Sequence, residues 1–230
     1  MNETTQKKEH LYEDLKRRIL TLDLEPGTDL EEVSLSKEYD ISRTPLRDVF
    51  RSLAGEGYLV IRNNRGAQVS PMSQKSLHDF FLVAPMIYSA VSRLAARNAQ
   101  PEHIRQLKAI QKKFTQALAD DNVEQKVFYN DQFHCLIGQM ADNPFLGPSL
   151  RRLLIDHARI AKTFYRGNNP DMKQDMETAC RQHDEMIEAF RNQDEERAER
   201  LTREHWDLSR HSFERFITPS GLDIKMDTDR

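Results

Sequence analysis

The spacing of apolar side chains changes along the 230-residue chain. Up to about Ser73, short stripes at helical spacing alternate with turn residues and two extended runs; beyond it only helical stripes follow one another. The first stripe predicts an amphipathic helix and consists of Leu11, Leu15, Ile19 and Leu22. The change predicts two domains, at 1–72 and 73–218, and the polar residues 219–230 are predicted to form a disordered tail.

Turn signals divide the first domain into short elements. Glu25-Pro26-Gly27-Thr28 places Pro and Gly at the central positions of a type II turn. A short helix through Tyr39 is then followed by a second helix that begins near Arg43, where Ser42 can cap the start. Pro45 falls in its first turn, where the missing N–H costs nothing. The buried face of this second helix is predicted to comprise Leu46, Val49, Phe50 and Leu53.

Two extended runs complete the first domain. Residues 58–62 and 67–69 flank Asn63-Asn64-Arg65-Gly66, whose composition is typical of a hairpin turn. Two helices joined by a short turn and followed by a basic hairpin indicate a winged helix-turn-helix. The fold class is therefore predicted to be mainly α, with a small β wing in the N-terminal domain.

The second domain is predicted to be an all-α antiparallel helical bundle. Its stripes are separated by polar or proline-containing breaks, and Gly is nearly absent from their interiors. The predicted helices span 74–99, 101–120, 122–141, 145–166, 171–192 and 194–217.

Composition indicates the cellular compartment of the protein and the state of its cysteines. Apolar residues make up 38% of the chain and charged residues 31%, and no uninterrupted apolar run approaches the length of a membrane span. The first ten residues lack the apolar core of a secretory signal, so a cytoplasmic protein without a membrane segment is expected. Cys135 and Cys180 stand in no metal-binding spacing and are expected to be reduced thiols.

Charge is distributed unevenly. The net charge of −3 alone argues against a general nucleic-acid binder. Between Ser42 and Gln68, however, five basic residues stand against two acidic ones, which gives a local charge of +3. The positive charge is thus concentrated on the second helix and the hairpin, although a solvated helix face would also carry such arginines.

These residues together resemble the GntR-type transcription regulators. The matching segments are Glu25-Pro26-Gly27-Thr28-Asp29-Leu30, Ser42-Arg43-Thr44-Pro45-Leu46-Arg47-Asp48, Leu53-Ala54-Gly55-Glu56-Gly57-Tyr58 and Arg65-Gly66-Ala67-Gln68-Val69. The all-helical second domain resembles the effector-binding FCD domain of the FadR subfamily. The resemblance implies a bacterial repressor or activator that binds a palindromic operator as a homodimer and responds to a small-molecule effector, such as a metabolite or organic acid.

The resemblance also implies which residues contact DNA. Arg43, Thr44 and Arg47 match the recognition-helix positions, and a planar guanidinium can bond guanine O6 and N7 together. Ser42 is expected to bond a phosphate or the helix start. Gly66, with Arg65 beside it, matches the wing tip, where a missing Cβ lets the backbone approach the minor groove. Many relatives carry a basic residue where this chain has Val33, so one DNA contact is expected to be absent.

Three histidines of the second domain lie inside apolar helical stripes and need partners there. They are His134, His183 and His205, each on a different predicted helix. Asn130 lies one turn before His134 on the same face, and Asp131 lies about 100° away. Three imidazoles and an oxygen ligand would suit Zn²⁺, Ni²⁺ or Mn²⁺. The alternative is a set of core histidines bonded to one another, to Asn130 and to water.

The set resembles the metal site of many FCD domains, in which an Asp occupies the position of Asn130. A neutral amide is a weaker ligand, so weaker metal binding is expected unless a bound carboxylate or Asp131 supplies the anion. An effector pocket is expected at Ala84, Tyr88 and His157. Relatives often carry Arg and Glu near the first two positions, so this pocket is expected to be more apolar and less suited to a simple carboxylate.

Two other functions fit part of the pattern. His134, the pair His183-Asp184 and Asp207 loosely resemble an HD-type metal phosphohydrolase, although the winged head would then have no role. The other function is a protein-interaction module, in which the winged domain binds a protein. The salt dependence of binding distinguishes it from DNA binding, because contacts between arginines and phosphates weaken steeply as salt rises.

Overall fold

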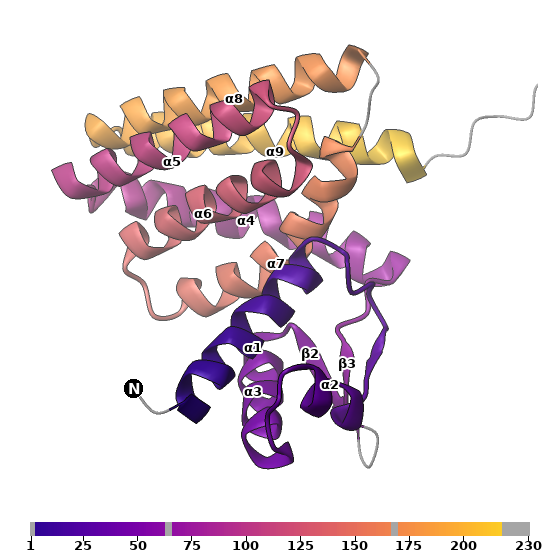
Figure 1. Cartoon of the computed structure of the whole chain (residues 1–230). Helices are drawn as coiled ribbons and strands as arrows, with labels where there is room; N and C mark the ends of the chain where they lie inside the picture. The colour runs from indigo at the N-terminus through magenta and orange to yellow at the C-terminus, as the bar shows by residue number, and fades with distance from the viewer. Residues whose placement is uncertain (1–2, 63–65, 167–169, 218–230) are drawn as a thin grey trace, which may run out of the picture.

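The computed structural model describes residues 3–62, 66–166 and 170–217. Within them the chain is mainly α, with a small three-stranded sheet near the N-terminus, which confirms the predicted fold class. Figure 1 shows a small winged head below a larger helical domain. The predicted tail at 219–230 and the wing residues Asn63, Asn64 and Arg65 lie outside the described residues.

The head consists of α1 (Glu3–Leu20), β1 (Asp29–Leu30), α2 (Glu32–Glu38), α3 (Arg43–Glu56), β2 (Leu59–Arg62) and β3 (Gly66–Val69). The helical domain consists of α4 (Gln74–Arg97), α5 (Pro101–Ala119), α6 (Val123–Ala141), α7 (Leu146–Tyr165), α8 (Pro170–Arg191) and α9 (Glu195–Ile217). Each of these last six helices begins and ends within two residues of its predicted range.

The turn after α1 has the predicted geometry. Gly27 has φ = 85°, and the Thr28 N–H donates to the Glu25 carbonyl at 3.0 Å, which closes the four-residue turn. Gly57 ends α3 with φ = 95°, as a left-handed helix cap requires. Local chemistry therefore fixes both changes of direction in the head.

The wing contains one strand more than the predicted hairpin. β3 is the central strand and pairs antiparallel with β2, with Leu59 opposite Val69 and Arg62 opposite Gly66. On its other side β3 pairs with the two-residue β1, which brings Leu30 opposite Ala67. This extra strand ties the segment before α2 to the base of the wing.

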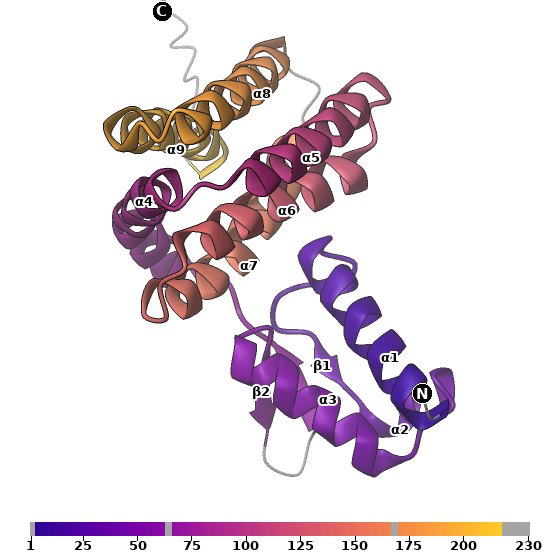
Figure 2. The ribbon, with the colours of Figure 1, turned by 90° about the vertical axis from the view of Figure 1, so that its left-hand side faces the viewer.

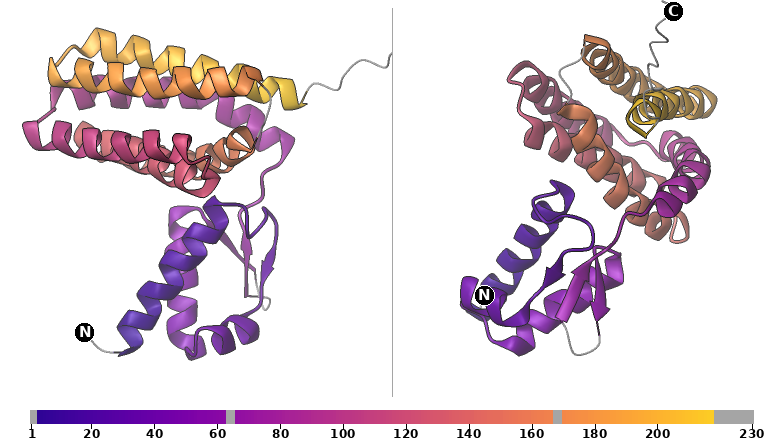
Figure 3. Two further views of the ribbon diagram at one scale, coloured as in Figure 1. Left: turned by 45° about the horizontal axis from the view of Figure 1, so that its top comes forward. Right: turned by 90° about the vertical axis from the view of Figure 1, so that its right-hand side faces the viewer.

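The helical domain has two layers. α4, α8 and α9 pack together on the side away from the head, while α5, α6 and α7 pack together on the side near it (Figure 3). α7 lies against the head, where it contacts α1 and α3 (Figure 2). The space between the two layers is therefore enclosed by helices from both.

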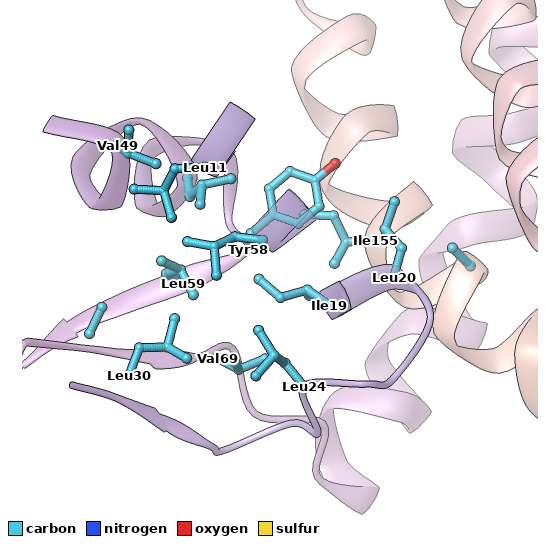
Figure 4. Close-up of a cluster of buried hydrophobic side chains, with 14 of the residues drawn as sticks. Leu11, Ile19, Leu20, Leu24, Leu30, Val49, Tyr58, Leu59, Val69 and Ile155 are labelled. Carbon is cyan, nitrogen blue, oxygen red and sulfur yellow. The ribbon is translucent and has the colours of Figure 1, made fainter. Parts of the chain in front are cut away.

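The head and α7 share one core. Ile155 and Ala158 of α7 join the buried cluster formed by the head residues, and Figure 4 shows Ile155 close to Tyr58 and Leu20. Two polar contacts reinforce the junction. Arg159 Nη1 donates to the Ser70 carbonyl at 3.1 Å, and Lys162 Nζ donates to Asp23 at 3.2 Å. The head and α7 are therefore joined by both packed side chains and polar contacts.

One helix of the described residues, α4, is long and apolar enough to cross a bilayer by length and composition. Its 18-residue apolar window is 44% buried within the protein, where α4 packs along α9. Core helices of globular domains pass the same test, and the helix packing places α4 among them.

Candidate functional site

The recognition helix α3 separates its buried and exposed faces as predicted. Leu46, Val49, Phe50 and Leu53 are all buried, whereas Ser42, Arg43, Thr44 and Arg47 are exposed. Ser42 stands at the N-cap position, but its side chain makes no capping hydrogen bond. The hydroxyl therefore leaves the first-turn N–H groups of α3 open, and these groups favour an anion such as a phosphate.

A groove separates α3 from the wing. It has a volume of about 480 Å³ and is lined by Glu32, Arg47, Phe50, Arg51, Ile61, Arg62 and Gly66. Arg47 and Arg51 come from the recognition helix and Arg62 from the wing. The fold thus brings three arginines from two separate segments to one concave surface.

Arg47 is held by a carboxylate that the sequence did not single out. Its Nε and Nη2 donate to the two carboxylate oxygens of Glu32 at 2.8 and 2.9 Å, and this guanidinium lowers the pKa of Glu32. Arg62 is similarly held by Gln68, with Nε 3.2 Å from Oε1. Both contacts are exposed, so each arginine has a local partner that a phosphate or a base can replace at low cost.

Gly66 is required where the wing meets β1. Its φ is 82°, and a Cβ placed on it would lie 2.6 Å from the Leu30 carbonyl oxygen. The backbone of the wing can approach β1 this closely because there is no side chain. Arg65 lies outside the described residues, so its place beside Gly66 stays a prediction. Val33, the position where one DNA contact is expected to be absent, is 49% exposed on α2.

The helical domain gathers its three predicted histidines between the two layers. His134 comes from α6, His183 from α8 and His205 from α9, and their nearest ring nitrogens all lie within 4.8 Å of one another. All three side chains are buried. Sequence positions 134, 183 and 205 thus meet at one point, as their places in the apolar stripes predicted.

Burial keeps these imidazoles neutral. Desolvation, followed by the neighbouring imidazoles, lowers the pKa of His134 and His183 well below the usual range. Desolvation also lowers the pKa of His205 to about 4 and that of His157 to about 3. Neutral imidazoles keep a nitrogen lone pair free, which is the form that binds metals.

Two of the cluster nitrogens are buried without a hydrogen-bond partner. They are Nε2 of His134 and Nε2 of His183. A buried nitrogen left unpaired costs on the order of 1–3 kcal/mol, so each calls for a ligand. Zinc–imidazole bonds of about 2.0–2.1 Å set nitrogens about 3.4 Å apart in a tetrahedral site, so a small contraction of this cluster would suffice. The residues therefore fit a divalent metal such as Zn²⁺, Ni²⁺ or Mn²⁺.

The expected oxygen ligand, Asn130, lies on the buried face of α6 one turn before His134 and is only 4% exposed. Asp131 is placed elsewhere. Its side chain lines a cleft between α1 and α6, beside Cys135, whose Sγ lies 3.8 Å from Asp131 Oδ2. Burial raises the pKa of Asp131 to about 6. Asp131 faces this cleft, so the expectation that it supplies an anion to the metal is not supported.

The carboxylates of the phosphohydrolase alternative also lie apart from the cluster. Asp184 lines a groove between α5 and α8, together with Lys108 and Lys112, and Asp207 is exposed on α9. The metal-binding group found in the described part of the chain contains histidines alone. An HD-type site needs the aspartate that follows its histidine at the metal, so that arrangement is not formed.

A small cavity adjoins one of the expected effector residues, Tyr88. Tyr88 and His134 line a cavity of about 10 Å³ together with Val91, Ser92, Ile137, Leu150, Met186 and Thr202. A space of this size suits one water or ion, not a metabolite. Ala84 is fully buried, and the ring of Trp206 packs on Tyr88 with centroids 4.9 Å apart. Trp206, which the sequence did not single out, thus packs against one of the expected effector residues.

His157 is part of the same polar centre. Its Nδ1 lies 2.9 Å from the Tyr88 hydroxyl, and its ring centroid is 4.8 Å from that of His134. The prediction placed Tyr88 and His157 in one pocket, and the structure puts them in direct contact. α7 therefore carries a residue beside the histidine cluster and, two positions later, Arg159 at the head.

A winged helix with arginines beside its wing, joined to a helical domain around a buried histidine cluster, defines a DNA-binding regulator with a sensor domain. The chain belongs to the gntR family of bacterial regulatory proteins, whose model matches residues 7–69, and it carries an FCD domain at residues 83–208.

Related sequences cover nearly the whole chain. The chain is 28% identical over 209 residues to the HTH-type transcriptional repressor RspR of Escherichia coli K12, covering 89% of this chain and 88% of that protein. It is 23% identical over 199 residues to the HTH-type transcriptional regulator YdhC of Bacillus subtilis strain 168, covering 85% of each.

Solved structures share the fold. McbR/YncC of E. coli superposes with a TM-score of 0.76 at 18% identity, over 94% of this chain and 100% of that one. A GntR transcriptional regulator from Rhodococcus sp. RHA1 gives 0.69 at 13% identity, over 90% and 98%. The winged head and the helical domain thus occur in this order and arrangement in other regulators.

Proposed function

We propose that this transcription regulator is a cytoplasmic protein that reads a palindromic operator through α3 and the wing. The arginines of the α3–wing groove support the proposal, because Arg47, Arg51 and Arg62 converge there from two segments of a chain whose net charge is negative. Arg43 and Arg47 contact base edges, Ser42 and Thr44 contact phosphates, and Gly66 with Arg65 enters the minor groove. Likeness to the repressor RspR favours repression.

A palindromic operator requires two heads, so we assign a homodimer. An apolar stripe on α4 supports this assignment: Leu82 is 70% exposed, Met86 65% and Val83 38%. Exposed apolar side chains clustered on one helix face mark an interaction surface. Sedimentation of the full chain should give the mass of a dimer, and a monomer at micromolar concentration would contradict the assignment.

A divalent metal at His134, His183 and His205, with Asn130 as the fourth protein ligand, completes the sensor. Such an ion would bind the buried nitrogens through their lone pairs and fix the relative positions of α6, α8 and α9. His157 and Tyr88 line the adjoining space, and an effector enters there only when the aromatic packing of Trp206 opens. α7 then carries the change to the head through Ile155 and Arg159.

Loss of one arginine tests the DNA-reading role. Operator fragments selected from genomic DNA by the wild-type protein are titrated with Arg47→Ala and with a control, Arg105→Ala, at an exposed position of α5. A bidentate base contact contributes about 1–3 kcal/mol of discrimination, so Arg47→Ala should weaken specific binding about 5- to 150-fold. Equal operator affinity in the two variants, measured by fluorescence anisotropy, would contradict the proposal.

A further inference from the structure

Two buried glutamines contact the outer nitrogens of the histidine cluster. Gln111 Oε1 of α5 lies 3.2 Å from Nδ1 of His183, and Gln182 Oε1 of α8 lies 3.0 Å from Nδ1 of His205. An amide carbonyl oxygen can only accept a hydrogen bond, so Nδ1 of each imidazole must carry the proton. A neutral imidazole with Nδ1 protonated has its lone pair on Nε2.

The orientation of the Gln111 amide is fixed from its other end. Its Nε2 donates to the Cys180 carbonyl at 2.8 Å. The same Nε2 lies 3.3 Å from Cys180 Sγ. The Cys180 carbonyl can only accept a hydrogen bond, so a flipped amide would set the carbonyl oxygen of Gln111 against another carbonyl oxygen. The carbonyl of Gln111 therefore faces His183.

The inner nitrogen of His183 agrees with this assignment. Nε2 of His183 is fully buried without a hydrogen-bond partner, as is Nε2 of His134. If Nε2 carried the proton, His183 would have an unpaired donor inside the core, and its Nδ1 lone pair would face the Gln111 oxygen. Both contacts would be unfavourable. Protonation at Nδ1 removes them and leaves Nε2 as an unpaired lone pair, which is the form that a metal can bind.

We propose that Gln111 and Gln182 are positioning residues that hold His183 and His205 in the Nδ1–H form and aim their Nε2 lone pairs into the cluster. The consequence for a metal rests on the proposed metal site; the protonation state itself does not. Outer contacts of this kind orient metal-binding histidines and raise their basicity, and their loss typically costs 10- to 100-fold in metal affinity.

The test has two separate measurements on the full chain stripped of metal by a chelator. The first is a long-range ¹H–¹⁵N correlation spectrum, which distinguishes the two protonated forms of each imidazole. His183 and His205 should be Nδ1–H in the wild-type protein. In Gln111→Met, His183 should lose this form while His205 keeps it. An Nε2–H signal for His183 in the wild-type protein would overturn the proposal, whether or not any metal binds.

The second measurement is metal affinity, with Co²⁺ followed by its visible absorption and Zn²⁺ by competition with a chromophoric chelator. Gln111→Met and Gln182→Met should each bind about 10- to 100-fold more weakly than the wild-type protein. Gln116→Met, at an exposed position one to two turns along α5, is the matched control and should bind as the wild type does. Unchanged affinity in Gln111→Met would overturn the positioning role.

The two measurements separate the two ideas. A wild-type protein with Nδ1–H imidazoles that binds neither Co²⁺ nor Zn²⁺ would refute the metal function and support the role of the glutamines in setting the protonated nitrogen. A wild-type protein that binds metal but shows Nε2–H imidazoles would support the metal function and refute the role of the glutamines. Circular dichroism of each variant identifies any loss of fold, and the wild-type spectrum decides the matter without a variant.

Discussion

The head and the helical domain hold their polar groups in opposite ways. In the α3–wing groove, Arg47 is 54% exposed at its side chain and pairs with a carboxylate that DNA can replace. In the histidine cluster, His183 is fully buried, and the Gln111 amide oxygen and neighbouring rings contact it. Exposed ion pairs contribute about 0–1 kcal/mol, whereas an unpaired buried group costs several times as much. The head is therefore easily rearranged, and the cluster favours one arrangement.

Removal of a cluster histidine should have the largest effect. His183→Leu deletes one of the three imidazoles, and the loss of Zn²⁺ affinity should exceed the roughly 100-fold limit expected for an outer contact. Isothermal titration calorimetry of the variant and the wild-type protein measures the difference. His103→Leu, on α5 and outside the cluster, should titrate as the wild type does. An affinity loss of less than tenfold would mean that His183 is a core residue and not a ligand.

Acid should destabilise the metal-free protein through the same histidines. Burial lowers the pKa of His157 to about 3, below the ordinary value of 6.5, so the unfolded chain takes up the proton first. The contribution of neutral His157 to the free energy of unfolding is therefore present above pH 6.5. It is lost as the pH falls toward the pKa of His157 in the folded protein. At pH 5 this loss is about 2 kcal/mol for one such group.

Substitution isolates that contribution. In His157→Gln, the decrease in unfolding free energy between pH 7.5 and pH 5 should be smaller by about 2 kcal/mol than in the wild-type protein. Exposed His78 provides the control, and His78→Gln should follow the wild-type curve. Urea denaturation at a series of pH values gives the comparison. Parallel curves for His157→Gln and the wild type would show that His157 is not held neutral by burial.

The smallest effect is expected at the exposed ion pair of the head. Glu32→Gln removes a negative charge beside Arg47 and weakens the competition for its guanidinium. Affinity for non-specific DNA should rise a few-fold at low salt, and the slope of log affinity against log salt should steepen by about one unit. Glu102→Gln on α5 changes the net charge equally without touching the groove. If both variants behave alike, Glu32 does not restrain Arg47.

The difference between the two regions also explains what the sequence could predict. Leu46, Val49, Phe50 and Leu53 repeat at helical spacing, so the buried face of α3 was predictable from local pattern alone. The histidines were predictable for the same reason, since each interrupts an apolar stripe. β1 was not predicted, because a two-residue strand has no period and depends on pairing with residues 67 and 68.

Contacts between side chains that are distant in the sequence could not be predicted either. Gln111 and His183 are 72 positions apart, and a glutamine on a helix carries no sign of which side chain it will meet. Glu32 and Arg47 belong to neighbouring helices, but only their relative placement makes the ion pair. Trp206 lies next to His205, yet the pattern gave no indication that its ring would fill the space beside Tyr88.

The central claim is that the state of the histidine cluster controls the head through α7. The direct test is operator affinity by fluorescence anisotropy, for wild-type protein stripped by chelator and for the same protein with Zn²⁺ restored, with His183→Leu measured in parallel. A coupling of about 1–3 kcal/mol predicts a change of about 5- to 150-fold in the wild-type protein and none in His183→Leu. Identical operator affinities for the stripped and restored wild-type protein would contradict the claim.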